Sequence, residues 1–502
     1  MLYESTREKK NVLGAMEAIK QGISPDGGLF VPQTIPAVLI KDLASLVRAD
    51  YRERAKFILN LYLTDFKKED INNSVQAAYN EKSFQSPDIA PLEPLADNLH
   101  TLELWHGPTA AFKDMALQLL PHLMTRAIIN TNEDKEIVIL TATSGDTGKA
   151  ALEGFKDVEG TRIMVFYPAK GVSNMQRLQM ITQEGENVKV MGVEGNFDDT
   201  QSGVKSIFAS DISKQLEDKG FRLSSANSIN WGRLVPQIVY YFSAWLDLLK
   251  TGAITESQSF NVVVPTGNFG NILAAYYAKA MGLPIGRLIC ASNDNSILTD
   301  FINTGVYDTN RRFYTTTSPS MDILISSNLE RLLYELYDRD DKKVLSLMQE
   351  LATTGKYSID GEALKRLQAL MYGGYANMDQ ASLAIRETFR EYDYLLDTHT
   401  AVGKSVYDEY RKETGDDLAT ILVSTASPYK FPAYVLDALE IRPDSEDELD
   451  HLEILKKVTG KAIPGPLKGL ASKPIKHKGV CEIKDMEGQV LSFLEQGLGE
   501  NE

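Results

Sequence analysis

Short apolar runs alternate with longer amphipathic stretches from about residue 135 onward. Runs of this kind are typical of strands buried on both faces of a sheet, and the stretches between them have helical spacing. We expect strands at residues 136–141, 162–167, 188–193, 261–264, 288–291 and 420–424, and helices at 149–155 and 271–281. This alternation predicts an α/β fold with layered, mostly parallel sheets and helices on both faces.

The flanking regions follow other patterns. The N-terminal part mixes helical spacing, as at 44–60, with turns such as Pro25–Gly28, and a helix over 115–129 follows although it contains Pro121. Ser173 precedes a helix with Gln176 in the capping-box position. We expect a mixed N-terminal domain at 1–95, a large domain from 96–134 and 216–502 with a helical insertion at about 320–415, and a small mobile domain at 135–215.

Composition narrows the class of protein. The 502 residues carry a formal net charge of −16, which argues against a nucleic-acid or anionic-membrane partner. The two cysteines are far apart, and the six histidines form no metal-binding motif, so we expect neither a disulfide framework nor a metal site. We see no signal peptide and no apolar run long enough to span a bilayer. A cytoplasmic enzyme is the expectation.

Three segments carry candidate chemistry. Lys113 stands where a loop meets the expected helix, and Phe112 beside it would help to desolvate its amine. A single lysine is usually a solvated surface residue, so this reading depends on the other two segments. Both are glycine-containing turns between an expected strand and an expected helix, at 143–148 and 265–271.

The turn at 265–271 is typical of an anion-binding nest, because glycines let successive backbone N–H groups point inward at a helix N-terminus. It matches neither a P-loop nor a full dinucleotide fingerprint, and a simple tight turn is the alternative. In the turn at 143–148, Ser144 and Thr147 suit a carboxylate, while Asp146 suits either a cofactor's phenolic oxygen or a helix cap. An amine with two anion-binding turns is what pyridoxal phosphate and an amino-acid substrate require.

With these segments assembled, the chain closely resembles the threonine synthase family of fold-type II pyridoxal-phosphate enzymes. The resemblance covers nearly the whole length. Its motifs are Tyr3–Arg7, Pro25–Leu29, His106–Asp114, Ser144–Gly148, Gly185–Val188, Glu194–Asp199, Ser225–Trp231, Pro265–Asn271 and Ser424–Ala426. The family often has histidine where Ser427 stands and proline where Thr398 stands, which leaves the lysine and the phosphate turn untouched.

The resemblance implies a role for each matching residue. Lys113 binds pyridoxal phosphate covalently; Gly267, Asn268, Phe269 and Asn271 hold its phosphate; and Thr425, with Ser424 nearby, faces the pyridine nitrogen. Asp146 lies at the cofactor, and it faces the substrate's amino-acid end together with Ser144 and Thr147. The candidates for gripping the phosphate of the substrate O-phospho-L-homoserine are Asn227, Ser228, Asn230 and Arg233.

The implied reaction turns O-phospho-L-homoserine and water into L-threonine and phosphate, in a monomer or a homodimer. Alternatives are another fold-type II lyase, such as a threonine or serine dehydratase or a phosphohomoserine lyase, and a non-catalytic pyridoxal-phosphate-binding homologue. A nucleotide-binding module is a more distant alternative.

Overall fold

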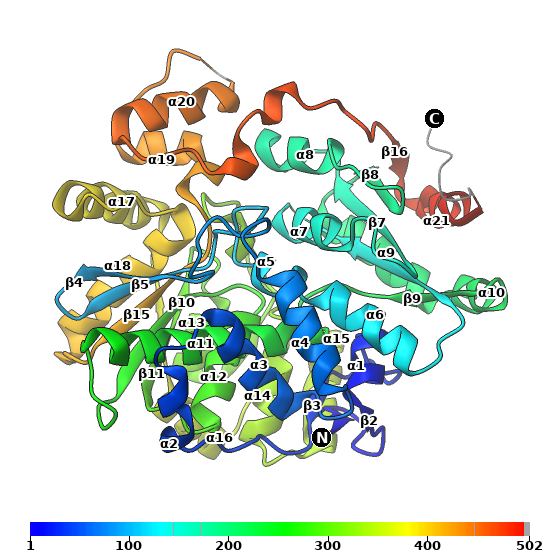
Figure 1. Ribbon diagram of the computed structural model, residues 1–502, viewed down its shortest axis with the longest axis horizontal. Coiled ribbons are helices and arrows are strands. Elements are labelled where there is room, and N and C mark those ends of the chain that lie inside the picture. The colour runs from blue at the N-terminus through cyan, green and yellow to red at the C-terminus, as the bar shows by residue number, and fades with distance from the viewer. Residues whose placement is uncertain (144, 171, 446, 496–502) are drawn as a thin grey trace.

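The computed structural model describes residues 1–143, 145–170, 172–445 and 447–495 of the chain (Figure 1). Its larger sheet has six strands in the order β14-β11-β10-β15-β5-β4, all parallel to their neighbours except the edge strand β4. The strands are β4 (Leu92–Ala96), β5 (Leu99–Glu103), β10 (Phe260–Pro265), β11 (Ile285–Ser292), β14 (Met371–Tyr375) and β15 (Thr420–Ser424). The expected α/β class with mostly parallel sheets is confirmed.

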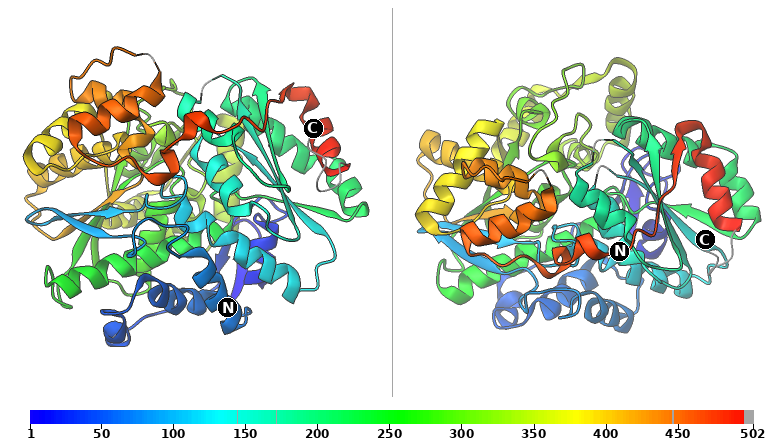
Figure 2. Two further views of the ribbon diagram at one scale, coloured as in Figure 1. Left: turned by 45° about the horizontal axis from the view of Figure 1, so that its top comes forward. Right: turned by 90° about the horizontal axis from the view of Figure 1, so that it is seen from above.

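A second sheet has five strands in the order β16-β8-β7-β6-β9, all parallel. They are β6 (Glu136–Ala142), β7 (Thr161–Pro168), β8 (Val188–Glu194), β9 (Phe221–Ser224) and β16 (Val480–Glu482). Figure 2 shows how β16 reaches this sheet: the orange-to-red C-terminal chain crosses from α20 (Glu448–Thr459), near the larger sheet, to α21 (Met486–Glu495). The sheet thus includes strands outside 135–215, and the division into domains stays a prediction.

The strands foreseen from apolar runs are all present, whereas five strands of the two sheets were not foreseen: β4, β5, β9, β14 and β16. Strand β14 contains Gly373 and Gly374, which weaken a strand pattern. Strand β5 carries His100, Thr101 and Glu103 among its apolar residues, yet all five of its residues are buried. Tertiary pairing therefore decided these strands, and local sequence did not.

The helix expected over 115–129 is two helices, α5 (Asp114–Leu117) and α6 (Leu120–Asn130). The break lies just before Pro121, which occupies the first turn of α6. Proline lacks an N–H and its ring clashes with the preceding turn, so it is best tolerated near a helix start. The interruption leaves α5 as a single short turn directly after Lys113.

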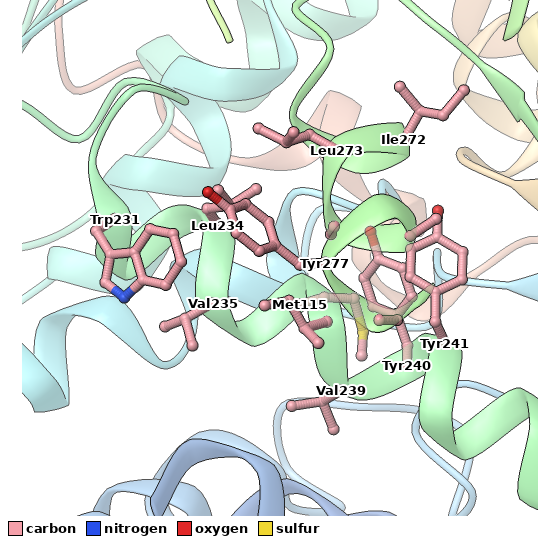
Figure 3. Packing of buried hydrophobic residues seen from close by; sticks show 14 of the residues in the cluster. Met115, Trp231, Leu234, Val235, Val239, Tyr240, Tyr241, Ile272, Leu273 and Tyr277 are labelled. Atoms are coloured by element: carbon pink, nitrogen blue, oxygen red, sulfur yellow. The ribbon is translucent and has the colours of Figure 1, made fainter. Parts of the chain in front are cut away.

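The core of the larger layer is built on α11 (Trp231–Thr251), which is buried along most of its length and packs against α3 (Tyr51–Tyr62) and α12 (Gly270–Ala280). Figure 3 shows Trp231 on α11 beside Tyr277 on α12, with Tyr240 and Tyr241 together farther along α11. The rings of Trp231 and Tyr277 meet edge to face, with centroids 5.5 Å apart. No helix among the described residues has the length and apolar character to cross a bilayer.

Helices α7 (Asp146–Phe155) and α5 meet at Gly154, which makes this glycine sensitive to substitution. A Cβ at Gly154 would lie 2.0 Å from the backbone oxygen of Leu117. We predict that Gly154→Ala lowers the free energy of unfolding by about 1–3 kcal/mol, because the helices must separate. The matched control is Gly488→Ala in α21, where a Cβ would meet nothing within 4 Å. This change should stabilise by roughly 0.5–1 kcal/mol, and equal effects in urea denaturation would contradict the packing argument.

Candidate functional site

Five loops that follow strands of the two sheets converge on the candidate site. They follow the carboxyl ends of β5, β6, β9, β10 and β15. Ligands of parallel α/β sheets bind beyond these strand ends, which is where the lysine loop and the two glycine-containing turns lie.

The lysine loop after β5 is held by Asp114. Its carboxylate accepts hydrogen bonds from the backbone N–H of Thr109 at 2.8 Å and from the Thr109 hydroxyl at 2.7 Å. A Cβ at Gly107 would lie 2.5 Å from the Asp114 side chain, so this position requires glycine. Burial raises the pKa of Asp114 to about 6, although the Thr109 hydrogen bonds favour its ionised form. The loop thereby places Lys113 at the start of α5.

The Lys113 amine is largely withdrawn from solvent, with 11% of the side chain exposed. Its Nζ donates to the Ser320 hydroxyl at 3.3 Å, lies 3.9 Å from Oδ2 of Asp146, and stands over the Phe112 ring. Burial lowers the pKa of this amine to about 8; the Asp146 carboxylate opposes the change, and the Arg233 cation reinforces it. A large share of Lys113 side chains is therefore neutral, and nucleophilic, near pH 8.

Asp146 is the first residue of α7, but it does not act as the helix cap considered from sequence. The cap position is Gly145, and the Thr143 hydroxyl, not the Asp146 carboxylate, accepts from the backbone N–H of Gly148 in the first turn. The Asp146 carboxylate instead pairs with Lys430 at 2.8 Å and accepts from Nε2 of Gln176 at 2.9 Å. Burial opposes ionisation of Asp146, but Lys430 and Lys113 outweigh it and hold its pKa well below the usual range.

The Gln176 side chain therefore binds Asp146 and does not form the capping box. Ser173 does cap α8 (Asn174–Ile181), because its hydroxyl accepts from the backbone N–H of Gln176. The Gln176 side chain, which would complete a capping box by reaching back to the Ser173 backbone, is directed at the candidate site.

The turn after β10 forms a cup of backbone N–H groups. Phe269 has a left-handed backbone with φ of 65°, directly before α12. The carbonyl oxygens of Gly267 and Asn268 accept hydrogen bonds from Ser326 and Asn328. Within the described residues, the backbone N–H groups of 267–271 donate to no other residue. Free donors at a helix N-terminus are the requirement for holding a phosphate.

Asn271 adds a side-chain donor to this cup. Its Oδ1 accepts from the hydroxyls of Tyr240, at 2.7 Å, and Tyr241. Its Nδ2 is buried and has no partner among the described residues. The two tyrosines, which lie side by side in Figure 3, therefore fix the amide with its NH₂ as the unused donor. A buried donor without a partner is costly, and a phosphate oxygen would satisfy it, so these residues fit pyridoxal phosphate.

Thr425 and Ser424 end β15 beside the lysine loop. The Thr425 carbonyl accepts from the backbone N–H of Phe112 at 2.8 Å, and its own N–H donates to the Thr400 hydroxyl at 3.3 Å. The Thr425 hydroxyl has no hydrogen bond to another described residue. Ser424 accepts from the Trp105 indole at 3.0 Å. Thr425 is therefore the residue of this pair with a free hydroxyl for a cofactor ring.

The loop after β9 and the first turn of α11 hold the residues expected to grip a substrate phosphate. Arg233 is 2% exposed; its Nη1 donates to the carbonyl of Ala226, and its Nε has no partner among the described residues. Burial lowers the pKa of Arg233 to about 10, so it remains a cation at neutral pH. Asn227 and Ser228 are partly exposed beside it.

Asn230 in this loop uses its whole side-chain amide for hydrogen bonds within the protein. Its Oδ1 accepts from the backbone N–H of Gly232, and its Nδ2 donates to the carbonyls of Ile19 and Ser225. The amide caps α11 and is fully used, so its predicted contact with a substrate phosphate would require breaking one of these bonds.

The remaining sequence candidates are placed as follows. Thr147 is partly exposed in the first turn of α7, and Ser144 lies outside the described residues. Ser427, where the family often has histidine, is buried and caps a short 3₁₀ helix, η3 (Pro428–Lys430).

Sequence reasoning missed the loop that carries Ser320. The Ser320 N–H donates to Nε2 of His399 at 3.1 Å, and Nδ1 of His399 lies 2.9 Å from Asp397. The ring proton is therefore on Nδ1. Asp322 anchors the same loop by accepting from Asn293 at 2.7 Å. No local motif could have revealed these contacts, because they join segments far apart in the chain.

The Asn271 amide gives a testable prediction. Asn271→Asp keeps the shape but replaces the free donor with an anionic acceptor, which repels phosphate. We expect the apparent Kd for pyridoxal phosphate to rise about 10- to 100-fold, the range for losing a charge-assisted hydrogen bond. Absorbance titration measures this, with pyridoxal, which lacks the phosphate, as the matched control. An equal loss for both ligands would contradict the assignment of Asn271 to the phosphate.

Three family models match the chain. They are described as threonine synthase N terminus, over residues 2–79; pyridoxal-phosphate dependent enzyme, over 91–382; and threonine synthase, C-terminal, over 400–477.

Individual relatives agree with these models. Human threonine synthase-like 1 is 41% identical over 90% of this chain, but the match covers 61% of its own length, so the chain spans about three fifths of that relative. Threonine synthase of Pseudomonas aeruginosa is 40% identical over 87% of this chain and 90% of its own. The solved structure of pyridoxal-phosphate-bound threonine synthase from Brucella melitensis has a TM-score of 0.87 and 36% identity, and covers 99% of this chain and 100% of its own. The chain belongs to the threonine synthase family of fold-type II pyridoxal-phosphate-dependent enzymes.

Proposed function

We propose that this chain is a threonine synthase, which converts O-phospho-L-homoserine and water into L-threonine and phosphate. The observation that carries the proposal is the buried Arg233 guanidinium, whose Nε has no partner among the described residues and which is near enough to Lys113 to lower its pKa. The cup at 267–271 accounts for a cofactor phosphate. A second anion-binding group beside the lysine suits a substrate that carries a phosphate of its own.

The residues that would hold pyridoxal phosphate are Lys113 at its aldehyde carbon, the backbone of 267–271 with Asn271 at its phosphate, Thr425 at its ring nitrogen and Asp146 at its phenolic oxygen. When bound, the cofactor supplies an electron-withdrawing ring that acidifies protons on the substrate carbons beside the amino group. A neutral hydroxyl at Thr425 leaves the ring nitrogen less protonated than a carboxylate would, which limits this electron withdrawal.

Lys113 is the residue that moves protons. Its amine has a pKa of about 8, so it takes and returns a proton readily near neutral pH. The Ser320 hydroxyl, 3.3 Å from Nζ, orients the amine, and Asp146 stabilises its protonated form. One mobile amine can therefore serve successive proton transfers at neighbouring carbons.

Arg233, Asn227 and Ser228 would hold the substrate phosphate before and after it leaves. The partly exposed Thr147 would meet the substrate carboxylate at the positive end of α7. Burial of the site excludes bulk water until the carbon chain is ready to accept one molecule.

We also propose a cytoplasmic location, supported by two cysteines that are both free. All of the groups named above lie on one chain, which is compatible with either a monomer or a homodimer.

The reaction itself is the first test. With O-phospho-L-homoserine, the protein should release L-threonine and inorganic phosphate in equal amounts, and Lys113→Ala should reduce the rate at least about 1,000-fold, because the proton-transferring group is lost. Amino-acid analysis and a phosphate assay measure both products. A 2-oxo acid in place of threonine would identify a dehydratase-type lyase, and no turnover would indicate a non-catalytic homologue.

Arg233→Met tests the second anion site. It removes the cation while keeping an apolar side chain that suits the burial of Arg233. We expect kcat/KM for O-phospho-L-homoserine to fall about 100-fold and inhibition by inorganic phosphate to weaken in parallel, because a buried charged hydrogen bond is lost. The control is the Kd for pyridoxal phosphate in the same variant, which should stay within about twofold. If cofactor binding weakened as much as substrate use, Arg233 would belong to the cofactor site or to the fold.

A further inference from the structure

Lys430 is a fully buried lysine to which the proposed reaction assigns no role. It ends η3, one residue after Tyr429, and 0% of its side chain is exposed. Its Nζ donates to the carbonyl of Thr109 at 3.0 Å and to Oε1 of Gln179 at 3.0 Å, and it lies 2.8 Å from Oδ1 of Asp146. An ammonium group has three protons to donate, and three oxygens lie within 3.0 Å of this one.

The three acceptors come from three separate segments. Thr109 belongs to the lysine loop, Asp146 begins α7 and Gln179 lies on α8, next to the second sheet. Lys430 itself follows β15 of the larger sheet. Its ammonium therefore joins the loop that carries the reactive lysine to the two helices that carry Asp146 and its partner Gln176.

The Asp146 carboxylate lies between the two lysines, with a different oxygen toward each. Oδ1 faces Lys430 and accepts from Gln176, whereas Oδ2 lies 3.9 Å from Lys113 and 3.5 Å from the Ser320 hydroxyl. The contact with Lys430 is the shorter, so this pair holds the carboxylate in place and leaves the other oxygen for Lys113.

We propose that Lys430 is a positioning residue that keeps Asp146 ionised and oriented while the Lys113 amine gains and loses its proton. This inference rests on the proposed role of Lys113.

The charge on Asp146 explains why Lys430 is needed in addition to Lys113. Were Lys113 the only cation beside Asp146, each loss of its proton would leave a buried carboxylate without a counter-charge, which is strongly unfavourable. With Lys430 present, that loss leaves a complete ion pair. The Lys430 cation also disfavours a second positive charge nearby, which eases loss of the proton.

Some of the charged groups around Lys113 raise its pKa and others lower it. Burial lowers the pKa of Lys113; Asp146 opposes this, Arg233 and Lys430 reinforce it, and Asp114 opposes it more weakly. Removing Lys430 would leave Lys113 as the cation that pairs with Asp146, so Lys113 should hold its proton to a higher pH.

The test measures the proton on Lys113 directly. Competitive acetylation of the full-length protein freed of cofactor, followed by peptide mapping across pH 6–11, gives the midpoint at which Lys113 becomes reactive. We expect a wild-type midpoint near 8. In Lys430→Met and Lys430→Gln it should rise by about one pH unit, so that labelling at pH 7.5 falls about tenfold. Lys430→Arg, which keeps the charge, should restore at least half of this change.

Lys149→Met is the matched control, because it removes a buried lysine from α7 that pairs with Glu153 and Gln183 rather than with Asp146. It should leave the Lys113 midpoint unchanged. An unmoved midpoint in folded Lys430→Met or Lys430→Gln would overturn the proposal. So would failure of both variants to fold while Lys149→Met folds, since Lys430 would then be a clamp of the fold. Labelling uses no substrate, so it is independent of the turnover assay. A wild-type protein that made no threonine would refute the proposed function but would not change the expected shift of the Lys113 midpoint.

Discussion

The candidate site depends on one buried carboxylate, Asp146, between the ammonium groups of Lys430 and Lys113. Burial disfavours a charge at this position, yet the two cations and the Gln176 amide hold it ionised. Because Asp146 begins a helix beside the five-stranded sheet and both lysines lie in loops of the six-stranded sheet, this ion pair also fixes the two layers against each other. The same ion pair therefore sets the charge around Lys113 and holds the two sheets together.

A second constraint is the overall negative charge of the chain. With a formal net charge of −16, long-range attraction cannot bring a phosphate to the protein. The fold supplies local donors instead: backbone N–H groups at the start of α12, an Asn271 amide oriented by Tyr240 and Tyr241, and a guanidinium buried at the start of α11. Each is placed by a core element, so the tyrosine-rich packing between α11 and α12 also shapes the anion sites.

Local patterns identified the parts of the site that are contiguous in sequence. The turn at 265–271 and Lys113 were found because a strand, a turn and a helix start occur together within a few residues. Contacts such as those of Ser320 with His399, or of Lys430 with Asp146, join residues more than 70 positions apart, and sequence spacing carries no signal for them. Asn230, whose amide caps α11, was grouped with the phosphate-binding candidates for a different reason. An asparagine in a loop before a helix can bind a ligand or cap the helix, and residue type does not distinguish these roles.

The most direct test is to reduce the protein loaded with pyridoxal phosphate with sodium borohydride and to map the labelled peptide. Both Lys113 and Lys430 are lysines at the site, but only Lys113 is expected to bond the cofactor, because the Lys430 ammonium is fully buried and held by two hydrogen bonds and an ion pair. We expect one labelled residue, Lys113. A label on Lys430, or no label on the lysine loop, would contradict it.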